Sequence, residues 1–128
     1  MRQKVEGFTL PELLFAAAVL AFVLVSLLFI FTSCLFLDES SRNSTLATSH
    51  AEYVIEDIKD TSFAQIPAMA GTWDTSAITA AGLNPVTGES IVIAVSGVNP
   101  LNINVTVNWS DRGNRSRSIS FSTLITEP

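Results

Sequence analysis

The stretch that decides the fold runs from Leu13 to Leu37 and reads LLFAAAVLAFVLVSLLFIFTSCLFL. It contains no charged residue, and its only polar side chains are those of Ser26, Thr32 and Ser33. An α-helix rises about 1.5 Å per residue, so this stretch would reach about 37 Å and cross a hydrocarbon core of about 30 Å. A chain of 128 residues cannot bury such a helix on every side. We therefore expect a membrane-spanning helix.

The charges on either side of this stretch predict its orientation. Arg2 and Lys4 precede it, whereas Asp38 and Glu39 follow it. Because basic residues favour the cytoplasmic side, the N-terminus is expected in the cytoplasm and residues 38 onward outside. The whole chain has 7 basic and 12 acidic residues, which provides no basic face for nucleic acid.

Two kinds of processing signal compete with a plain membrane anchor. A secretory signal peptide has an apolar core of about 7 to 15 residues before a site of small residues, and this stretch is longer and lacks that site. The residues Phe31 to Cys34 resemble a lipoprotein signal weakly, but the apolar run continues beyond Cys34. Because a lone cysteine cannot form an intramolecular disulfide, we interpret Cys34 as a small apolar packing residue.

A short motif, Gly7-Phe8-Thr9-Leu10-Pro11-Glu12, adjoins the apolar stretch. Glu12 is a carboxylate at the edge of an apolar helix, where an ionisable group usually serves a function and has a partner. Cleavage between Gly7 and Phe8 would create such a partner, because the new α-amino group would be positive and would lie one helical turn from Glu12.

With its basic leader, this motif and the long apolar helix, the chain resembles the type IV pilin superfamily. The resemblance implies that residues 1–7 are a leader, which a prepilin peptidase removes after Gly7 before it N-methylates Phe8. It also implies that Glu12 pairs with the terminal amine of a neighbouring subunit during assembly. A simpler alternative is that Glu12 only caps the helix, whose N-terminal dipole attracts an anion. Pro11 departs from the β-branched residue or Leu that is commoner in the family, but the first helical turn tolerates it.

Aromatic residues recur every seven positions along the predicted helix. A straight helix drifts only about 20° per heptad, so these side chains form one slowly turning stripe. Roughly opposite, Ala17 and Ala21 are small residues four apart, a spacing that permits close helix approach. The stripe packs between helices in a fibre core or, alternatively, faces lipid without a specific partner. Its members are Phe8, Phe15, Phe22, Phe29 and Phe36.

The sequence after this helix predicts one small exported domain, and the chain as a whole an α+β fold. We assign residues 8–37 to the transmembrane or filament-core helix and residues 38–66 to its amphipathic continuation, whose three- and four-residue periodicity reaches about Ser62. Residues 67–128 should form a loop and an antiparallel sheet of about three to four strands, on which the helix packs. The strand signals are Ile91–Val95, Leu101–Trp109 and Ile119–Ile125.

Turn residues separate these strands at Asn99-Pro100 and at Ser110–Asn114. Trp73, within the predicted loop from Phe63 to Glu89, is expected to anchor that loop on the domain, with exposure as a binding aromatic as the alternative. The side chains expected to cover the helix are Ile103, Val105, Val107, Ile119 and Phe121.

The remaining polar residues do not assemble a catalytic site. His50 is expected to be a partly exposed helix residue, because no second His or metal-ligand spacing accompanies it. Arg112, Arg115 and Arg117 are interpreted as a solvated hairpin, with binding of an acidic partner as the alternative. There is no nucleophile–base constellation and no phosphate-binding glycine motif, so we expect no enzyme, metal site or cofactor.

The resemblance favours a structural subunit, a minor pilin or minor pseudopilin of a type IV pilus-like filament or a type II secretion pseudopilus. It implies an inner-membrane precursor with a periplasmic domain, which is later polymerised through its helix. The implied partners are the prepilin peptidase/methyltransferase, other pilins or pseudopilins and the inner-membrane assembly platform. The competing interpretation is a single-pass, membrane-anchored exported binding domain that does not polymerise.

Overall fold

The computed structural model describes residues 7–127. Positions 1–6 of the predicted leader, including Arg2 and Lys4, lie outside the described residues. Between Asp38 and Glu39 the chain divides into two compact units. A single helix, α1 (Leu10–Asp60), contributes residues to both.

The described part of the first unit contains the apolar part of α1, whose apolar side chains are exposed along the whole segment. This helix is long and apolar enough to cross a membrane, by length and composition. The three hydroxyl side chains between Leu13 and Leu37 donate hydrogen bonds to the backbone of the same helix: Ser26 to the Phe22 carbonyl at 2.9 Å, and Thr32 and Ser33 to the Phe29 carbonyl at 2.9 and 2.8 Å. The hydroxyls would therefore need no other partner in hydrocarbon.

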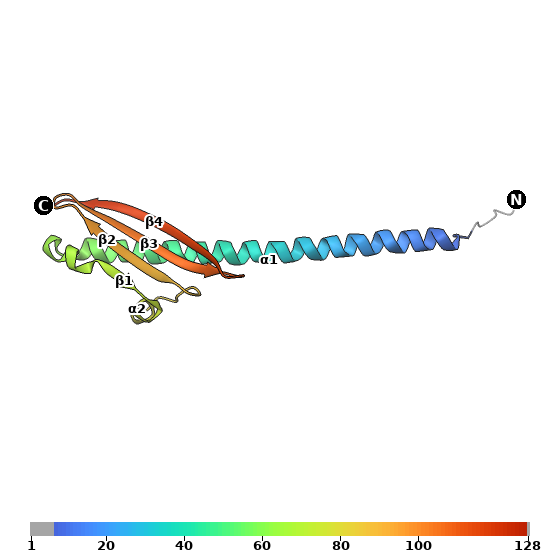
Figure 1. The fold of residues 1–128 in the computed structure, drawn as a ribbon, viewed down its shortest axis with the longest axis horizontal. Helices are drawn as coiled ribbons and strands as arrows, with labels where there is room; N and C mark the ends of the chain where they lie inside the picture. Colours follow the sequence, from blue (N-terminus) through green and yellow to red (C-terminus); the bar gives the residue numbers. More distant parts are fainter. Residues whose placement is uncertain (1–6, 128) are drawn as a thin grey trace. The chain divides into compact units, whose positions relative to one another are not determined.

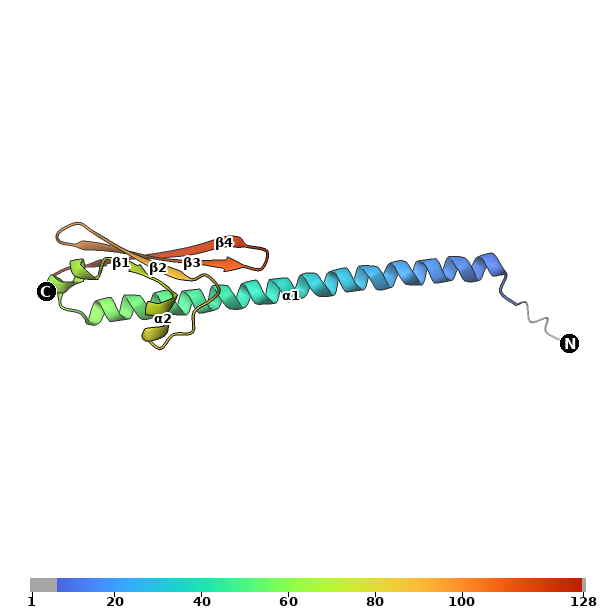
Figure 2. The ribbon, with the colours of Figure 1, turned by 60° about the horizontal axis from the view of Figure 1, so that its bottom comes forward.

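The second unit contains a four-stranded antiparallel sheet in which the strands follow their sequence order. Its members are β1 (Gly71–Trp73), β2 (Ser90–Ser96), β3 (Leu101–Asp111) and β4 (Arg115–Ile125). Figures 1 and 2 show the C-terminal half of α1 lying along one face of this sheet. The predicted α+β fold, a long helix packed on a small antiparallel sheet, is confirmed.

The core of the second unit lies between α1 and the sheet. On the helix, four residues spaced three or four apart are fully buried, namely Ala47, Ala51, Val54 and Ile58. The strands alternate as a half-buried sheet should, so Ile103, Val105 and Val107 of β3 face this helix and are fully buried too. Ile119 and Phe121 of β4 also pack against the core but are only half-buried, because β4 is an edge strand.

The segment after the helix contains more regular structure than predicted. The helical continuation expected over residues 38–66 is wrong at its end, because α1 ends at Asp60 and a 3-10 helix follows at Phe63–Met69. Pro67 lies in that short helix and has no backbone N–H to extend α-helical hydrogen bonding. The predicted loop also includes β1 and the helix α2 (Thr75–Ala80), which the Asp74 side chain caps by accepting from the Ala77 N–H at 2.9 Å.

Trp73 ends β1 and packs, half-buried, against the core, which confirms its predicted role as an anchor. The turn from β2 to β3 depends on Gly97, whose φ is +87°. A Cβ at this position would come within 2.7 Å of the Pro100 carbonyl oxygen, so a larger residue would displace the backbone. The turn from β3 to β4 likewise has positive φ at Gly113 and Asn114.

Candidate functional site at the start of the long helix

The candidate site begins one residue before α1, where Thr9 occupies the position that caps the helix. Its carbonyl accepts hydrogen bonds from the backbone N–H groups of Glu12 and Leu13, both at 3.1 Å. In return, Glu12 Oε2 accepts from the Thr9 N–H and from Thr9 Oγ1, both at 3.4 Å. This Thr-x-x-Glu arrangement forms one half of a capping box, in which the Glu12 carboxylate reaches back to the Thr9 N–H.

In the single subunit, therefore, Glu12 does cap the helix, which is the simpler of the two roles considered for it. Both of its hydrogen bonds are long and solvent-exposed. A charged amine donating to a carboxylate forms a shorter bond, near 2.7 to 2.9 Å, of about twice the strength of a neutral one. The carboxylate consequently remains available to a better donor.

The residues on either side of the predicted cleavage point are accessible. Gly7 and Phe8 precede α1, and the Phe8 side chain is 79% exposed. No atom lies within 4 Å of the place where a Cβ on Gly7 would stand. Together with Thr9 and Glu12, these two residues line an open hollow at the helix start. Because this segment lies outside the helix, a peptidase could reach it without first unfolding any helical turn.

The predicted aromatic stripe lies on an uncovered surface of the single subunit. Phe15, Phe22 and Phe29 are each exposed by roughly three quarters of their area, and Phe36 by 51%. Ala17 and Ala21 are exposed as well. An apolar surface this extensive is not stable in water, so lipid or other helices must cover it. Which of the two the stripe contacts remains a prediction.

No family model, curated protein or solved structure matches this chain.

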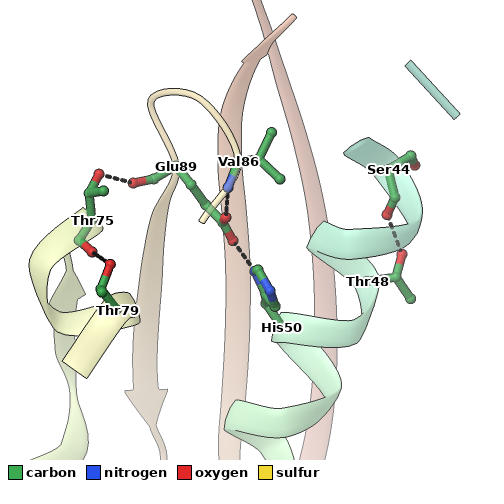
Figure 3. Close-up of polar contacts among 7 residues, drawn as sticks. All are labelled: Ser44, Thr48, His50, Thr75, Thr79, Val86 and Glu89. Carbon is green, nitrogen blue, oxygen red and sulfur yellow. Dashed lines mark hydrogen bonds and ion pairs between the residues drawn. The ribbon is translucent and has the colours of Figure 1, made fainter. Parts of the chain in front are cut away.

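A second polar site, which the sequence did not predict, lies inside the second unit. His50 is buried, with 4% of its area exposed, so the expectation of a partly exposed residue is wrong. Its Nδ1 lies 2.7 Å from Oε1 of Glu89, which is equally buried. The other Glu89 oxygen, Oε2, accepts from the Val86 N–H at 2.6 Å. Figure 3 shows Glu89 reaching from the start of β2 towards His50 on α1, so the pair ties the segment before β2 to the helix.

The third polar site centres on Asp111 at the end of β3. Four side chains donate to its carboxylate: Asn43 at 3.1 Å, Ser40 at 3.0 Å, Trp109 at 3.2 Å and Arg117 at 3.3 Å. The hydrogen bond from Asn43 is the main cause that lowers the pKa of Asp111 below its ordinary 3.8; the bonds from Ser40, Trp109 and Arg117 also lower it, and partial burial opposes them. Asp111 thus joins the β3–β4 hairpin to α1 just after the point where the two units divide.

The three arginines of this hairpin are exposed, as predicted. Arg117 lies 3.3 Å from Asp111, and Arg112 lies 3.7 Å from Glu39. Such exposed pairs contribute little to stability. Within residues 7–127, no three His, Cys, Asp or Glu side chains are grouped so as to hold a metal ion.

Proposed function

We propose that this chain is the precursor of a type IV pilin-like structural subunit, of the minor pilin or minor pseudopilin kind. In this proposal a prepilin peptidase/methyltransferase removes the leader after Gly7 and methylates the new N-terminus, Phe8. The subunit waits in the inner membrane with its N-terminus in the cytoplasm and its sheet domain in the periplasm. An assembly platform then transfers it into a filament with other pilins or pseudopilins.

One juxtaposition supports this proposal above all. An accessible Gly7–Phe8 segment and a weakly engaged Glu12 carboxylate adjoin an apolar stretch of helix whose side chains are not buried by the part of the chain that the structure describes. An anchor that served only to hold a domain in the membrane would need the apolar helix but not the Gly-Phe-Thr-Leu-x-Glu arrangement. A polymerising subunit would use both, because other helices would cover its apolar helix and a neighbour's amine would supply the cation for its Glu12 carboxylate.

In assembly, Glu12 would exchange the Thr9 donors for the terminal amine of a neighbour. The attraction between the two charges is strong where water is scarce, although desolvation offsets much of it. The resulting pair would fix the axial position of each helix against the next. The exposed stripe that includes Phe22 would then pack between helices in the fibre core.

Mass spectrometry of the mature N-terminus tests the processing step. Methylated Phe8 as the first residue is the expected result. An intact Met1, or a lipidated Cys34, would overturn the proposal in favour of an anchored domain that never polymerises.

A set of Glu12 variants separates pairing from capping. Glu12→Gln keeps an acceptor for the Thr9 donors but removes the charge, whereas Thr9→Val removes the hydroxyl donor but keeps the charge. Both variants should still be cleaved. We expect Glu12→Gln to lose filament incorporation by at least about tenfold, since a lost buried ion pair costs several kcal/mol, and Thr9→Val to retain it. Normal incorporation of Glu12→Gln would mean that the residue only caps the helix.

A further inference from the structure

The sheet of the exported domain has two open edges, and they differ in length and chemistry. β4 forms one edge with 11 residues and contains neither Pro nor Gly, and its charges, Arg115 and Arg117, stand at one end. In the part of the chain that the structure describes, no strand pairs with the outer side of β4. Natural proteins usually protect such an edge with charges, Pro or a bulge, so residues 118–125 form an unprotected pairing surface.

The opposite edge is formed by β1, which has only three residues. Gly71 and Thr72 are exposed, and no atom lies within 4 Å of a Cβ built on Gly71. The strand therefore ends the sheet with open space beside its glycine. An exposed acidic residue, Asp74, follows β1 immediately.

We propose that the β4 edge of one subunit pairs with the β1 edge of a second copy that points the same way, so that the sheet continues from copy to copy. The topology permits this, because the first and last strands of a four-stranded antiparallel meander run in opposite directions. Identical orientation of the copies rests on the proposed function, in which all subunits enter through one membrane. A head-to-tail contact of this kind does not close after two copies and so extends an assembly.

The register follows from the rungs of the sheet. Trp73, Ile91, Val107 and Ile119 form one rung, and Gly71, Ile93, Val105 and Phe121 form another. If a second copy continues these rungs, its Trp73 lies opposite Ile119 and its Gly71 opposite Phe121. The ring of a half-buried Phe then fills the space beside an edge glycine, a pairing known to stabilise edge glycines in sheets.

Other registers fit less well. A shift by one residue would turn the apolar side chains of the added strand to the opposite face. A shift by two would place Trp73 against either Phe121 or Arg117, and would leave the space beside Gly71 unfilled by an aromatic ring.

A disulfide between neighbouring copies tests this register. The third rung contains Thr72, Val92, Thr106 and Ser120, and both Thr72 and Ser120 are exposed on the face away from α1. Opposed residues on antiparallel strands have Cα atoms about 4.5 to 5.5 Å apart, which suits a disulfide. The full-length chain would carry Thr72→Cys and Ser120→Cys, with Cys34→Ser to remove the native thiol, and would be oxidised in intact cells.

Chains with both cysteines should form a ladder of disulfide-linked dimers, trimers and larger species. A mixture of the two single-cysteine chains should form dimers only. The matched control combines Thr72→Cys with Ser116→Cys, about 13 Å further along β4, and should yield at least about tenfold less product. Equal yields from the two pairs would overturn the proposal, and so would efficient dimers of Ser120→Cys alone, which would indicate symmetric β4–β4 pairing.

Two further measurements keep the result interpretable. A benzophenone side chain at position 72, in the otherwise unchanged chain, should attach on illumination to residues near Ser120 of another copy, and attachment elsewhere would contradict the register. The mature N-terminus is determined on the same samples. Methylated Phe8 and normal filaments without the 72–120 link would overturn the sheet contact alone, whereas an unprocessed N-terminus would overturn the proposed function.

Discussion

The two halves of α1 share one backbone geometry and have opposite surroundings. Between Leu13 and Leu37 the helix is apolar on every side and no residue is buried. Between Ala47 and Ile58 the apolar side chains are confined to one face, and that face is covered by the sheet. The apolar face of the second half is thus buried within the chain. The apolar surface of the first half is exposed, and lipid or other helices must cover it. The difference predicts that substitutions in the second half change the stability of the sheet domain, whereas substitutions in the first half change membrane insertion.

The largest effect is expected at the buried polar contact that links the covered half to the sheet. Glu89→Ala leaves His50 buried without its partner and the Val86 N–H without its acceptor. Each buried polar group left without its partner costs about 1 to 3 kcal/mol, so the variant, which leaves two such groups, should lower the free energy of unfolding by about 2 to 6 kcal/mol. Denaturant unfolding of the detergent-solubilised chain, followed by tryptophan fluorescence, measures it. The exposed Glu52→Ala serves as control, and a similar small change in both variants would show that the contact does not hold the domain together.

A matched pair of isoleucines compares the two halves directly. Ile58 is fully buried, whereas Ile30 is 58% exposed. Ile58→Ala should lower the free energy of unfolding of the sheet domain by about 2 to 5 kcal/mol, because it leaves a cavity in the core. Ile30→Ala should leave the same transition unchanged in the same denaturant assay. Equal losses from the two substitutions would mean that the first half of the helix also stabilises the domain.

Another experiment places a charge in the exposed first half of α1. Leu24→Lys puts an ammonium group near the middle of the apolar segment, where a lysine disfavours membrane insertion by about 2.5 to 3.5 kcal/mol. The inserted fraction, measured by protease protection of the sheet domain, should fall, while Leu24→Ala should insert normally. A lysine in place of Glu52, on the exposed side of the covered half, should not affect insertion. Unchanged insertion of Leu24→Lys would argue against a membrane-spanning role.

The same contrast explains which features were predictable from the sequence. The first half of α1 is evident from composition alone, since 25 consecutive uncharged residues leave few alternatives. β3 is evident from its strict alternation of apolar and polar residues. For β4 the prediction began at Ile119, but the strand begins at Arg115, because pairing with β3 rather than apolar side chains holds residues 115–118. β1 is too short for any alternation to be visible, and only its ladder with β2 defines it.

The buried contact between His50 and Glu89 could not be predicted from a sequence pattern. His50 follows Ala47 by three residues and precedes Val54 by four, so it lies beside the buried stripe of α1, and that spacing was the available signal. Its partner Glu89 is 39 residues away, and no local pattern connects the two. The Thr-x-x-Glu spacing at Thr9 and Glu12, by contrast, is readable from the sequence, and the helix-capping role considered for Glu12 follows from it.

The smallest expected effect concerns Asp111 at the end of β3, whose carboxylate accepts hydrogen bonds from Ser40 and Asn43 of α1. Its pKa is lowered in the folded domain, chiefly by the hydrogen bond from Asn43, so folding favours the charged form. The group therefore adds stability at pH values above its ordinary pKa of 3.8, and this contribution is lost as the pH falls through the lower folded value. Asp111→Asn should lower the free energy of unfolding by about 1 kcal/mol at pH 7.

The pH dependence separates this electrostatic contribution from simple loss of packing. Below pH 4 the difference between Asp111→Asn and the unmodified chain should shrink, because the Asp111 carboxyl of the unfolded chain takes up a proton there while the folded one, with its lowered pKa, still resists protonation. Denaturant unfolding at pH 7 and pH 3 measures both differences. Asn43→Ala, which removes the main donor, should reproduce part of the loss at pH 7 and little of it at pH 3. A constant difference at both pH values would assign the effect of Asp111 to packing of the hairpin against α1, and not to its charge.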